Sequence, residues 1–405
     1  MLPRLEPEER LAKNDRLIVI AIGAVIFGAF ALDVLSNFSW MKAGALVMLL
    51  AWFVLIVVHE LGHAFMAAGL GWRVCRIVIG VGAPVARFRV WGVPIQISRY
   101  PVGGHVVPAP TSVAGARWKS TLVFAAGPAA ELLVVALLVL VVGRERLLSA
   151  PDDFATLSAQ AVAVAALMGA VLNLIPIPSR EGQATDGLGM ILSPLLQDEV
   201  FEERLALPYT TQAESFLLAG RREQAVKVLR EGVVRLGGHL PAQVLLAAAL
   251  LEADAPRDIV ELLDPWITRE DVPKSLQPRI LALLALALVR SRPDRLEDAD
   301  AYTAHAHSLA PGYTSVRLAR ARVLLEQGQL HPALTALRGL ELGPFDERGA
   351  DARDVLFGLA ELRRGQRDSA RDLVNQLEAR GARGADLDLL RAELAGVHPP
   401  AEKCA

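Results

Sequence analysis

Residues 43–63 have the sequence AGALVMLLAWFVLIVVHELGH, and this stretch decides how the rest of the chain is interpreted. From Ala43 to Val58 there is no charged residue, and the run leads directly into His59-Glu60-Leu61-Gly62-His63, an H-E-x-x-H motif. A helix that spans a membrane needs about 20 predominantly apolar residues. The sequence therefore predicts a helix that carries two histidines and a glutamate inside a bilayer.

Composition divides the chain into two parts. The protein has 405 residues, of which 53% are hydrophobic; the long uncharged runs lie within the first 200 positions, and later positions alternate apolar with charged residues. We expect a transmembrane domain over residues 1–200, a soluble domain over residues 207–395 and a tail over residues 396–405. The net charge of −2 gives no indication of a nucleic-acid partner. Two cysteines, Cys75 and Cys404, exclude a disulfide framework and fit a reducing compartment.

Four segments are apolar and long enough to cross about 30 Å of hydrocarbon. They are Leu17 to Leu35, Ala43 to Leu70, Thr121 to Gly143 and Ala159 to Ile177. Four basic residues lie in segment 1–16 and seven in segment 71–120, against one in segment 36–42 and two in segment 144–158. The positive-inside rule then places both termini and the long loop in the cytoplasm. We expect a multi-pass protein of the cell membrane, in contact with lipid.

The long loop between the second and third spans has a β pattern. Residues 76–79, 86–91 and 95–98 are β-branched or alternating, and glycines and prolines separate them. The loop therefore predicts a small β-sheet at the inner membrane face, with Trp72, Trp91 and Trp118 in the interfacial belt.

After Leu207 the pattern is helical and repeats. Three glycines each stand three residues after a leucine and five before an alanine, and the triplets are Leu217-Gly220-Ala225, Leu325-Gly328-Ala333 and Leu362-Gly365-Ala370. The three alanines, taken together with Ile259 and Ala299, form a ladder of five positions. Successive positions of this ladder are 34, 40, 34 and 37 residues apart. A period near 34 with helix, tight turn and helix resembles tetratricopeptide repeats, and an irregular helical bundle is the alternative. We expect its concave surface to bind a protein partner or a substrate tail.

The expected fold class is mainly α. It combines a polytopic transmembrane helical core and a small β-rich loop at the membrane face with a soluble domain of tetratricopeptide-like helical repeats.

The H-E-x-x-H motif places both imidazoles on one face of a helix, because residues four apart are neighbours. His59 and His63 can therefore bind one zinc ion at about 2.0–2.1 Å. Glu60 can act as the general base in metal-assisted peptide hydrolysis. Two histidines and a carboxylate inside hydrocarbon cost several kcal/mol, which favours a functional site over histidines that only bond a neighbouring helix.

A hydrolytic zinc site needs a third protein ligand and an open position. The fourth span ends in Asn173-Leu174-Ile175-Pro176-Ile177-Pro178, where prolines stop the helix, and Asp186-Gly187 follow farther on. Broken backbone at membrane depth is tolerated where it lines a protein cavity. A carboxylate at this break can therefore turn toward the metal.

These motifs together resemble the site-2 protease family of intramembrane zinc metalloproteases. The resemblance covers residues 43–193 and rests on His59 to His63, Pro101-Val102-Gly103-Gly104, Ala126-Gly127-Pro128, Asn173 to Pro176 and Asp186-Gly187. It implies zinc as the cofactor, with His59, His63 and Asp186 as ligands and Glu60 as the catalytic acid and base.

The resemblance also implies how a transmembrane protein substrate is bound. Asn173 would contact the unwound backbone of the substrate. The β-rich loop, with Gly103 and Gly104, would position a substrate strand by edge pairing.

The sequence departs from the family pattern before the Asp-Gly pair. Family members place that pair a few residues after the proline, whereas Ser179 to Thr185 intervene in this chain. Glu181 in the insertion and Glu131 in the third span are therefore rival candidates for the third ligand. We favour Asp186, because Asp186-Gly187 opens a new apolar helix over residues 188–196. Glu131 follows Gly127-Pro128 where relatives often carry a polar amide, and we expect it mainly to form internal hydrogen bonds.

Two other function classes are compatible with parts of the sequence. A membrane-anchored scaffold would use the repeats and keep a vestigial metal site, but it would not need Glu60. A metal transporter would carry further histidines or aspartates along other spans, and only Glu131 is found there.

Overall fold

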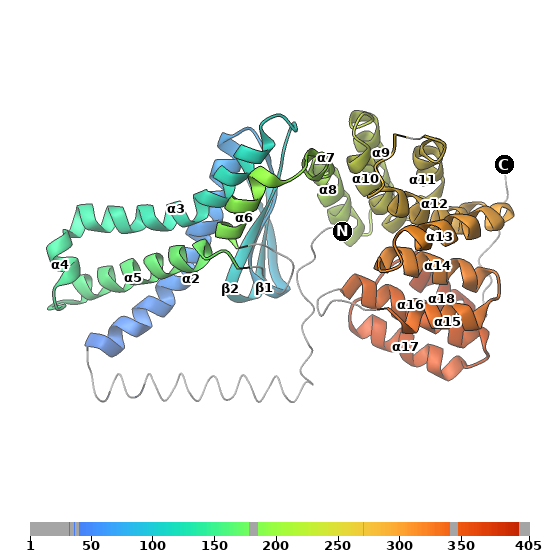
Figure 1. Ribbon diagram of the computed structural model, residues 1–405. Helices are drawn as coiled ribbons and strands as arrows, with labels where there is room; N and C mark the ends of the chain where they lie inside the picture. The colour runs from blue at the N-terminus through green and yellow to red at the C-terminus, as the bar shows by residue number, and fades with distance from the viewer. Residues whose placement is uncertain are drawn as a thin grey trace. The chain divides into compact units, whose positions relative to one another are not determined.

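The structure, a computed structural model, describes residues 40–177, 185–269, 271–340 and 347–396 together with Leu32 and Ser36. Its contacts divide the chain into two compact units, one of which ends at Phe201 while the other begins at Glu202. Helices predominate in both units, as predicted, and the first unit also holds a small sheet (Figure 1).

Three long apolar helices form the body of the first unit: α2 (Trp40–Gly69), α3 (Ala116–Val142) and α5 (Phe154–Leu174). Among the described residues these three are long and apolar enough to cross a membrane, and each packs against the other two (Figure 1). They correspond to the predicted second, third and fourth spans. The predicted first span, Leu17 to Leu35, lies outside the described residues except for Leu32. The unit also contains α4 (Arg144–Leu148), α6 (Asp186–Leu192) and the 3-10 helix η1 (Ser193–Leu195), and the boundary between the two units falls within α7 (Asp198–Arg204).

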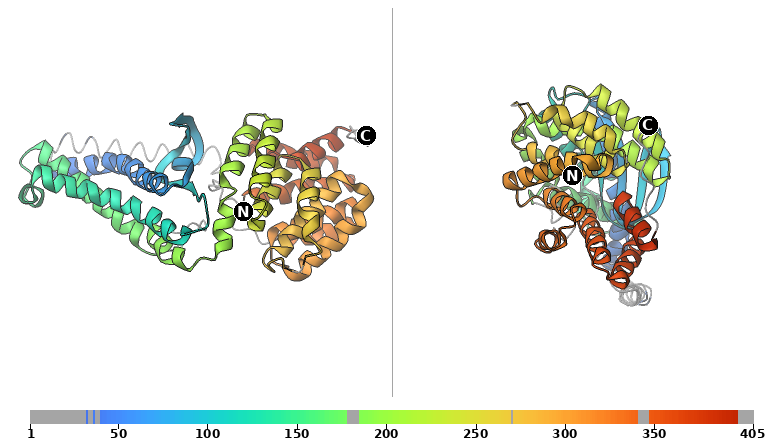
Figure 2. Two further views of the ribbon diagram at one scale, coloured as in Figure 1. Left: turned by 90° about the horizontal axis from the view of Figure 1, so that it is seen from above. Right: turned by 90° about the vertical axis from the view of Figure 1, so that its right-hand side faces the viewer.

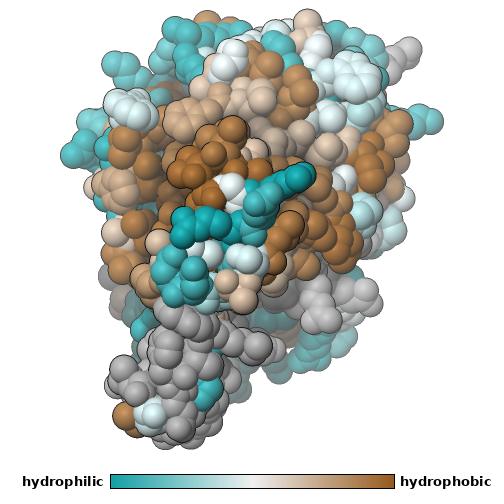
Figure 3. All heavy atoms as spheres, turned by 90° about the vertical axis from the view of Figure 1, so that its left-hand side faces the viewer, coloured by the Kyte–Doolittle hydropathy of each residue, from teal (hydrophilic) through white to brown (hydrophobic). Residues whose placement is uncertain are grey.

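The long helices bury small side chains and expose large apolar ones. Gly62 of α2 faces α3 so closely that a Cβ atom there would lie 2.5 Å from the carbonyl oxygen of Ala126. Leu133, Leu140 and Val171 point outward and are half-exposed or more, and hydrophobic residues cover much of the face in Figure 3. Close packing inside and large apolar side chains outside are what lipid-embedded helices require.

The chain's capping residues set where two of these helices begin. The α5 helix starts at Phe154, five residues before the predicted Ala159, because the Asp153 side chain accepts a hydrogen bond of 2.7 Å from the Thr156 amide. The α3 helix starts at Ala116 after Gly115, which has a φ of 68°.

The predicted sheet is present, and it is mixed. Strands β1 (Arg73–Val90) and β2 (Val93–Ala109) meet at a turn in which Trp91 and Gly92 have φ values of 49° and 83°. Ile77 pairs with Val106 and also with Ile95, so the two long strands together form four adjacent segments. Their order is 104–109, 73–79, 93–98 and 84–90; the two central segments run parallel and the outer pairs antiparallel.

The second unit consists of helices and short 3-10 turns (Figure 2). The glycines Gly220, Gly328 and Gly365 have φ values of 71°, 74° and 85°. Each stands two residues after the end of a helix, and these helices are α8 (Leu207–Leu218), α14 (Thr314–Glu326) and α16 (Glu347–Arg363). The alanines that follow each glycine by five residues are fully buried. Three helix–turn–helix units are therefore present where the ladder predicts them, and the relation to tetratricopeptide repeats stays a prediction.

The helices of the second unit are α8 (Leu207–Leu218), α9 (Arg222–Arg235), α10 (Leu240–Glu252), α11 (Pro256–Leu263), α12 (Gln277–Ser291), α13 (Leu296–Leu309), α14 (Thr314–Glu326), α15 (Leu330–Arg338), α16 (Glu347–Arg363), α17 (Arg367–Ala379) and α18 (Ala385–Ala395), and the 3-10 turns are η2 (Asp264–Trp266) and η3 (Pro293–Arg295).

Candidate metal centre

The H-E-x-x-H motif lies near the end of α2, on the side that faces α3 and the sheet. His59, Glu60 and His63 are 7%, 4% and 8% exposed. The imidazole centroids are 4.7 Å apart and the two Nε2 atoms 3.1 Å apart, as the helical spacing of four residues requires. Two metal-binding nitrogens therefore point at one position.

Each ring turns its Nδ1 atom away from that position. His63 Nδ1 donates a hydrogen bond of 2.6 Å to the carbonyl oxygen of Val123, and because a carbonyl only accepts, the ring proton must be on Nδ1. His59 Nδ1 lies 3.1 Å from Oε2 of Glu131. Both Nε2 atoms are thereby left as donors for a metal.

Asp186, the first residue of α6, lies directly against the two Nε2 atoms. Its Oδ2 atom is 2.9 Å from His59 Nε2 and its Oδ1 atom is 3.3 Å from His63 Nε2. Within the described ranges, these three residues form the group that could hold a metal ion, with ligand atoms all within 4.8 Å of one another. The structure thus brings together the three residues predicted as zinc ligands.

The insertion before Asp186 does not separate it from the helix that precedes it, because Thr185 returns to the end of α5. The Ile177 amide donates to Thr185 Oγ1 at 3.2 Å, and the Thr185 amide donates to the Ile177 carbonyl at 3.4 Å. The Thr185 hydroxyl also donates to the Ile175 carbonyl at 2.7 Å and caps α6 by accepting from the Leu188 amide. Ile177 and Thr185, the described residues on either side of positions 178–184, are therefore adjacent. Glu181, the rival ligand in the insertion, lies outside the described residues.

The donor set fits a zinc ion. Two imidazole nitrogens and one carboxylate oxygen are the ligands of hydrolytic zinc sites, and they leave a fourth position open. Asp186 Oδ2 and Glu60 Oε2 are buried and have no hydrogen-bond partner among the described residues. Since buried polar atoms are normally satisfied, such carboxylate oxygens indicate a position for a cation or for water.

Two glycines provide the space that these side chains occupy. A Cβ atom on Gly104 of β2 would lie 2.7 Å from Glu60 Oε1, and one on Gly127 of α3 would lie 2.6 Å from His59 Nε2. Gly103 has nothing within 4 Å of its Cβ position. Of the two glycines predicted to bind substrate, Gly104 therefore lies against the general base and Gly103 faces open space. The role of Gly127 was signalled in the sequence only by the Gly-Pro pair in the third span.

The remaining candidates lie beside the three-residue group. Glu131 is 4% exposed and faces the Nδ1 side of His59, whereas Asp186 faces the Nε2 side. Asn173 lies in the last turn of α5 and donates a hydrogen bond of 3.1 Å to the Gly169 carbonyl. Contact of Asn173 with a substrate stays a prediction.

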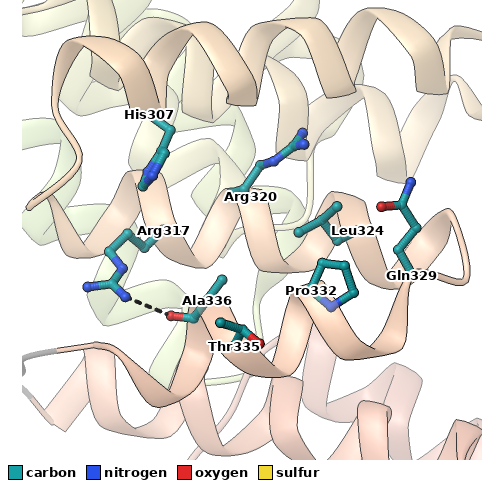
Figure 4. A pocket seen from close by; sticks show the side chains of 8 residues that line it. All are labelled: His307, Arg317, Arg320, Leu324, Gln329, Pro332, Thr335 and Ala336. Atoms are coloured by element: carbon teal, nitrogen blue, oxygen red, sulfur yellow. Dashed lines mark hydrogen bonds between the residues drawn. The ribbon is translucent and has the colours of Figure 1, made fainter.

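The second unit contains an open hollow of about 460 Å³ between α13, α14 and α15 (Figure 4). Its basic side chains are already engaged, since Arg317 donates to the carbonyls of Ala336 and Gly339 and Arg320 pairs with Asp300. The residues that line the hollow include no carboxylate and no group of metal ligands. The metal centre of the first unit is therefore the candidate catalytic site.

A comparison with protein families agrees with that assignment. No curated protein matches the chain. Residues 47–169 match Peptidase family M50, and the matched segment includes the H-E-x-x-H motif, the sheet, all of α3 and most of α5. The chain therefore contains a peptidase family M50 domain, that of the site-2 protease family, at residues 47–169.

Proposed function

We propose that this protein is an intramembrane zinc endopeptidase that hydrolyses peptide bonds in or next to transmembrane segments of other proteins. One observation carries the proposal: His59, His63 and Asp186 present ligand atoms within 4.8 Å of one another, on and beside a helix apolar enough to cross a membrane. Glu60 lies next to this group, and the M50 domain gives the same reaction class.

Zinc, when bound by these three residues, supplies Lewis acidity to the site. Glu60 accepts a proton from the attacking water and passes it to the nitrogen of the leaving peptide. Its Oε2 atom has no hydrogen-bond partner among the described residues, so this oxygen is free to hold the proton. Burial of the carboxylate keeps bulk water away from the reacting groups.

The sheet supplies a place for the substrate backbone. Segment 104–109 pairs with β1 along one edge, and its first residue, Gly104, lies against Glu60. An extended substrate segment that pairs with the other edge of segment 104–109 would pass beside Glu60, the general base. Asn173 and the broken backbone after α5 would hold the unwound part of the substrate.

The depth of the site supports cleavage near the cytoplasmic face. His59 follows Ala43 by sixteen residues, which is about 24 Å along a helix that rises 1.5 Å per residue, and the basic loop that follows α2 favours the cytoplasmic side. Both termini would then be cytoplasmic. The second unit would bind a protein partner or the tail of a substrate.

A scaffold with a vestigial metal site is less well supported. It has no use for a buried carboxylate at Glu60 or for the glycine at position 104 that makes room for it.

The test is a comparison of membrane proteins in cells that contain wild-type protein or the Glu60→Gln variant. We expect at least one transmembrane protein to accumulate uncut in the variant and to yield a shorter product in the wild type. Identical fragment patterns in cells that express the two proteins equally would contradict the proposed activity.

A further inference from the structure

Glu131 is a buried carboxylate that the three-ligand site does not include. It lies in the middle of α3, an apolar helix, and only 4% of its surface is exposed. A carboxylate at this depth is costly and is retained where it has a function. The ion pairs of the described residues give it one partner, His59, whose Nδ1 atom is 3.1 Å from Oε2; neither of these two buried atoms has another partner, and their contact is an ion-pair contact rather than a well-aligned hydrogen bond.

The packing around Glu131 fixes its position. Gly169 of α5 lies against the carboxylate, and a Cβ atom there would be 3.0 Å from the carboxyl carbon. Ala165, Ala166 and Ala170 on the same helix are also buried and have small side chains. The neighbouring helix therefore leaves room for this side chain and holds it behind the His59 ring.

We propose that Glu131 is a positioning residue that holds His59 ready for zinc, an inference that rests on the proposed function. Contact with the carboxylate keeps the ring proton on Nδ1 and leaves the Nε2 lone pair directed at Asp186 and His63. A carboxylate behind a ligating imidazole also makes the metal-binding nitrogen more basic. The Val123 carbonyl holds the ring proton of His63 on Nδ1 in the same way, but a carbonyl is a weaker acceptor than a carboxylate.

Charge balance supports this role. Glu60, Glu131 and Asp186 gather around two imidazoles, and among the described residues no lysine or arginine forms an ion pair with any of the three. Buried charges need partners. A bound dication offsets the charge of two carboxylates, so Glu131 contributes to metal affinity through its charge as well as through orientation.

The experiment measures the zinc dissociation constant of the full-length protein in detergent, by competition with a chelator. Loss of an outer partner of a zinc ligand typically weakens metal binding by about 10- to 100-fold. We expect Glu131→Gln to weaken binding by about 10-fold, because an amide oxygen keeps a polar group beside Nδ1 without the charge, and Glu131→Leu to weaken it by about 100-fold. Thr156→Ala, which removes the part-buried hydrogen bond from the Thr156 hydroxyl to Asp153 near the start of α5, should leave the constant unchanged.

The zinc-free protein provides the readout that separates positioning from structural support. The thermal midpoint of zinc-free Glu131→Leu should be equal to or above that of the wild type, since leucine suits the apolar helix. Two results would overturn the inference and leave the proposed function standing. One is a lowered midpoint of zinc-free Glu131→Leu with unchanged zinc affinity; the other is equal zinc affinity in the wild type, Glu131→Gln and Glu131→Leu. Failure of the wild type to bind zinc would instead refute the proposed function.

Discussion

Single glycines decide whether the reacting side chains of this protein fit. Gly104 has Glu60 Oε1 and the Val78 carbonyl both 2.7 Å from its Cβ position, whereas Gly103 beside it has open space. A methyl group at position 104 must therefore displace either the general base or the strand.

We predict that Gly104→Ala lowers kcat for peptide cleavage by about 10-fold or more, because general bases contribute about 10²- to 10⁴-fold when correctly placed. The control, Gly69→Ala at the end of α2, where nothing lies within 4 Å of the Cβ position, should retain near-normal turnover. Equal activity of the two variants in a cleavage assay of the purified protein would show that Gly104 does not set the position of Glu60.

Asp186 can be tested against its two rivals through zinc content. A site left with two histidines holds metal poorly at neutral pH, so Asp186→Ala should lose its zinc during purification. Glu181→Ala should keep the full zinc content by metal analysis, and Glu131→Ala should bind more weakly than wild type yet more tightly than Asp186→Ala. Full zinc occupancy in Asp186→Ala would assign the third ligand elsewhere.

The sequence predicts the helical part of the metal centre well, because H-E-x-x-H fixes its own geometry through the helical repeat. It leaves the third ligand open between Asp186, Glu181 and Glu131, since the distance that an insertion adds cannot be known without the contacts at its ends. The Thr185 hydrogen bonds that close the insertion join residues eight to ten positions apart. The side of His59 that Glu131 faces likewise depends on how α2 and α3 pack.

At the scale of elements, the sheet shows what pattern alone does not resolve. Alternation and turn residues predict strands within residues 73–110, but the register in which Ile77 pairs with both Val106 and Ile95 arises from bends within the strands. The repeat ladder is predicted better, because a positive-φ glycine followed by a buried alanine depends on local sequence. Three of its five positions show both features.

In the second unit, α18 is held to α12 and α14 by ion pairs of Asp386. Its carboxylate lies 2.8 Å from Arg290 and 3.3 Å from Arg322. Burial raises the pKa of Asp386, but the charges and hydrogen bonds of the two arginines outweigh burial and lower it overall. Because the folded-state pKa is below the unfolded value of about 3.9, these pairs stabilise the fold above about pH 4 and are lost as the pH falls through the lowered pKa.

We predict that Asp386→Asn lowers the free energy of unfolding of the second unit by about 2 kcal/mol at pH 7, the scale of hydrogen bonds to charged groups. The difference between variant and wild type should begin to shrink below about pH 4, where the unfolded wild-type chain takes up a proton first, and should be fully lost only below the lowered pKa of the folded-state carboxyl. Urea titrations of the fragment 205–396, with and without the substitution, at a series of pH values measure this difference in the free energy of unfolding. A difference that stays constant with pH would contradict the ionic origin of the effect.

At the scale of the whole molecule, the two units have separate cores, and the position of the boundary matters. Phe201 is fully buried with Ala67, Trp72, Ala116 and Val123, all of the first unit. A chain cut after Leu196 would lose this residue and open that core. A cut after Arg204, the end of α7, preserves it.

We predict that a protein ending at Arg204 still binds zinc and cleaves a small test peptide, but loses selectivity for its natural substrate, because the second unit would bind a partner or the substrate tail. The complementary fragment should be soluble and unfold cooperatively, since its buried clusters contain only its own residues. An insoluble fragment would contradict independent folding of the second unit, and unchanged selectivity of the shortened enzyme would contradict its role in substrate selection.

Above all, we propose that a zinc site inside the first unit hydrolyses peptide bonds with Glu60 as the base. The most direct measurement combines metal analysis with cleavage of a transmembrane peptide by purified wild-type and Glu60→Gln protein in detergent. We predict equal zinc content in the two proteins and a loss of turnover of about 100-fold or more in the variant. Near-normal cleavage by Glu60→Gln, or cleavage by wild-type protein that contains no zinc, would contradict it.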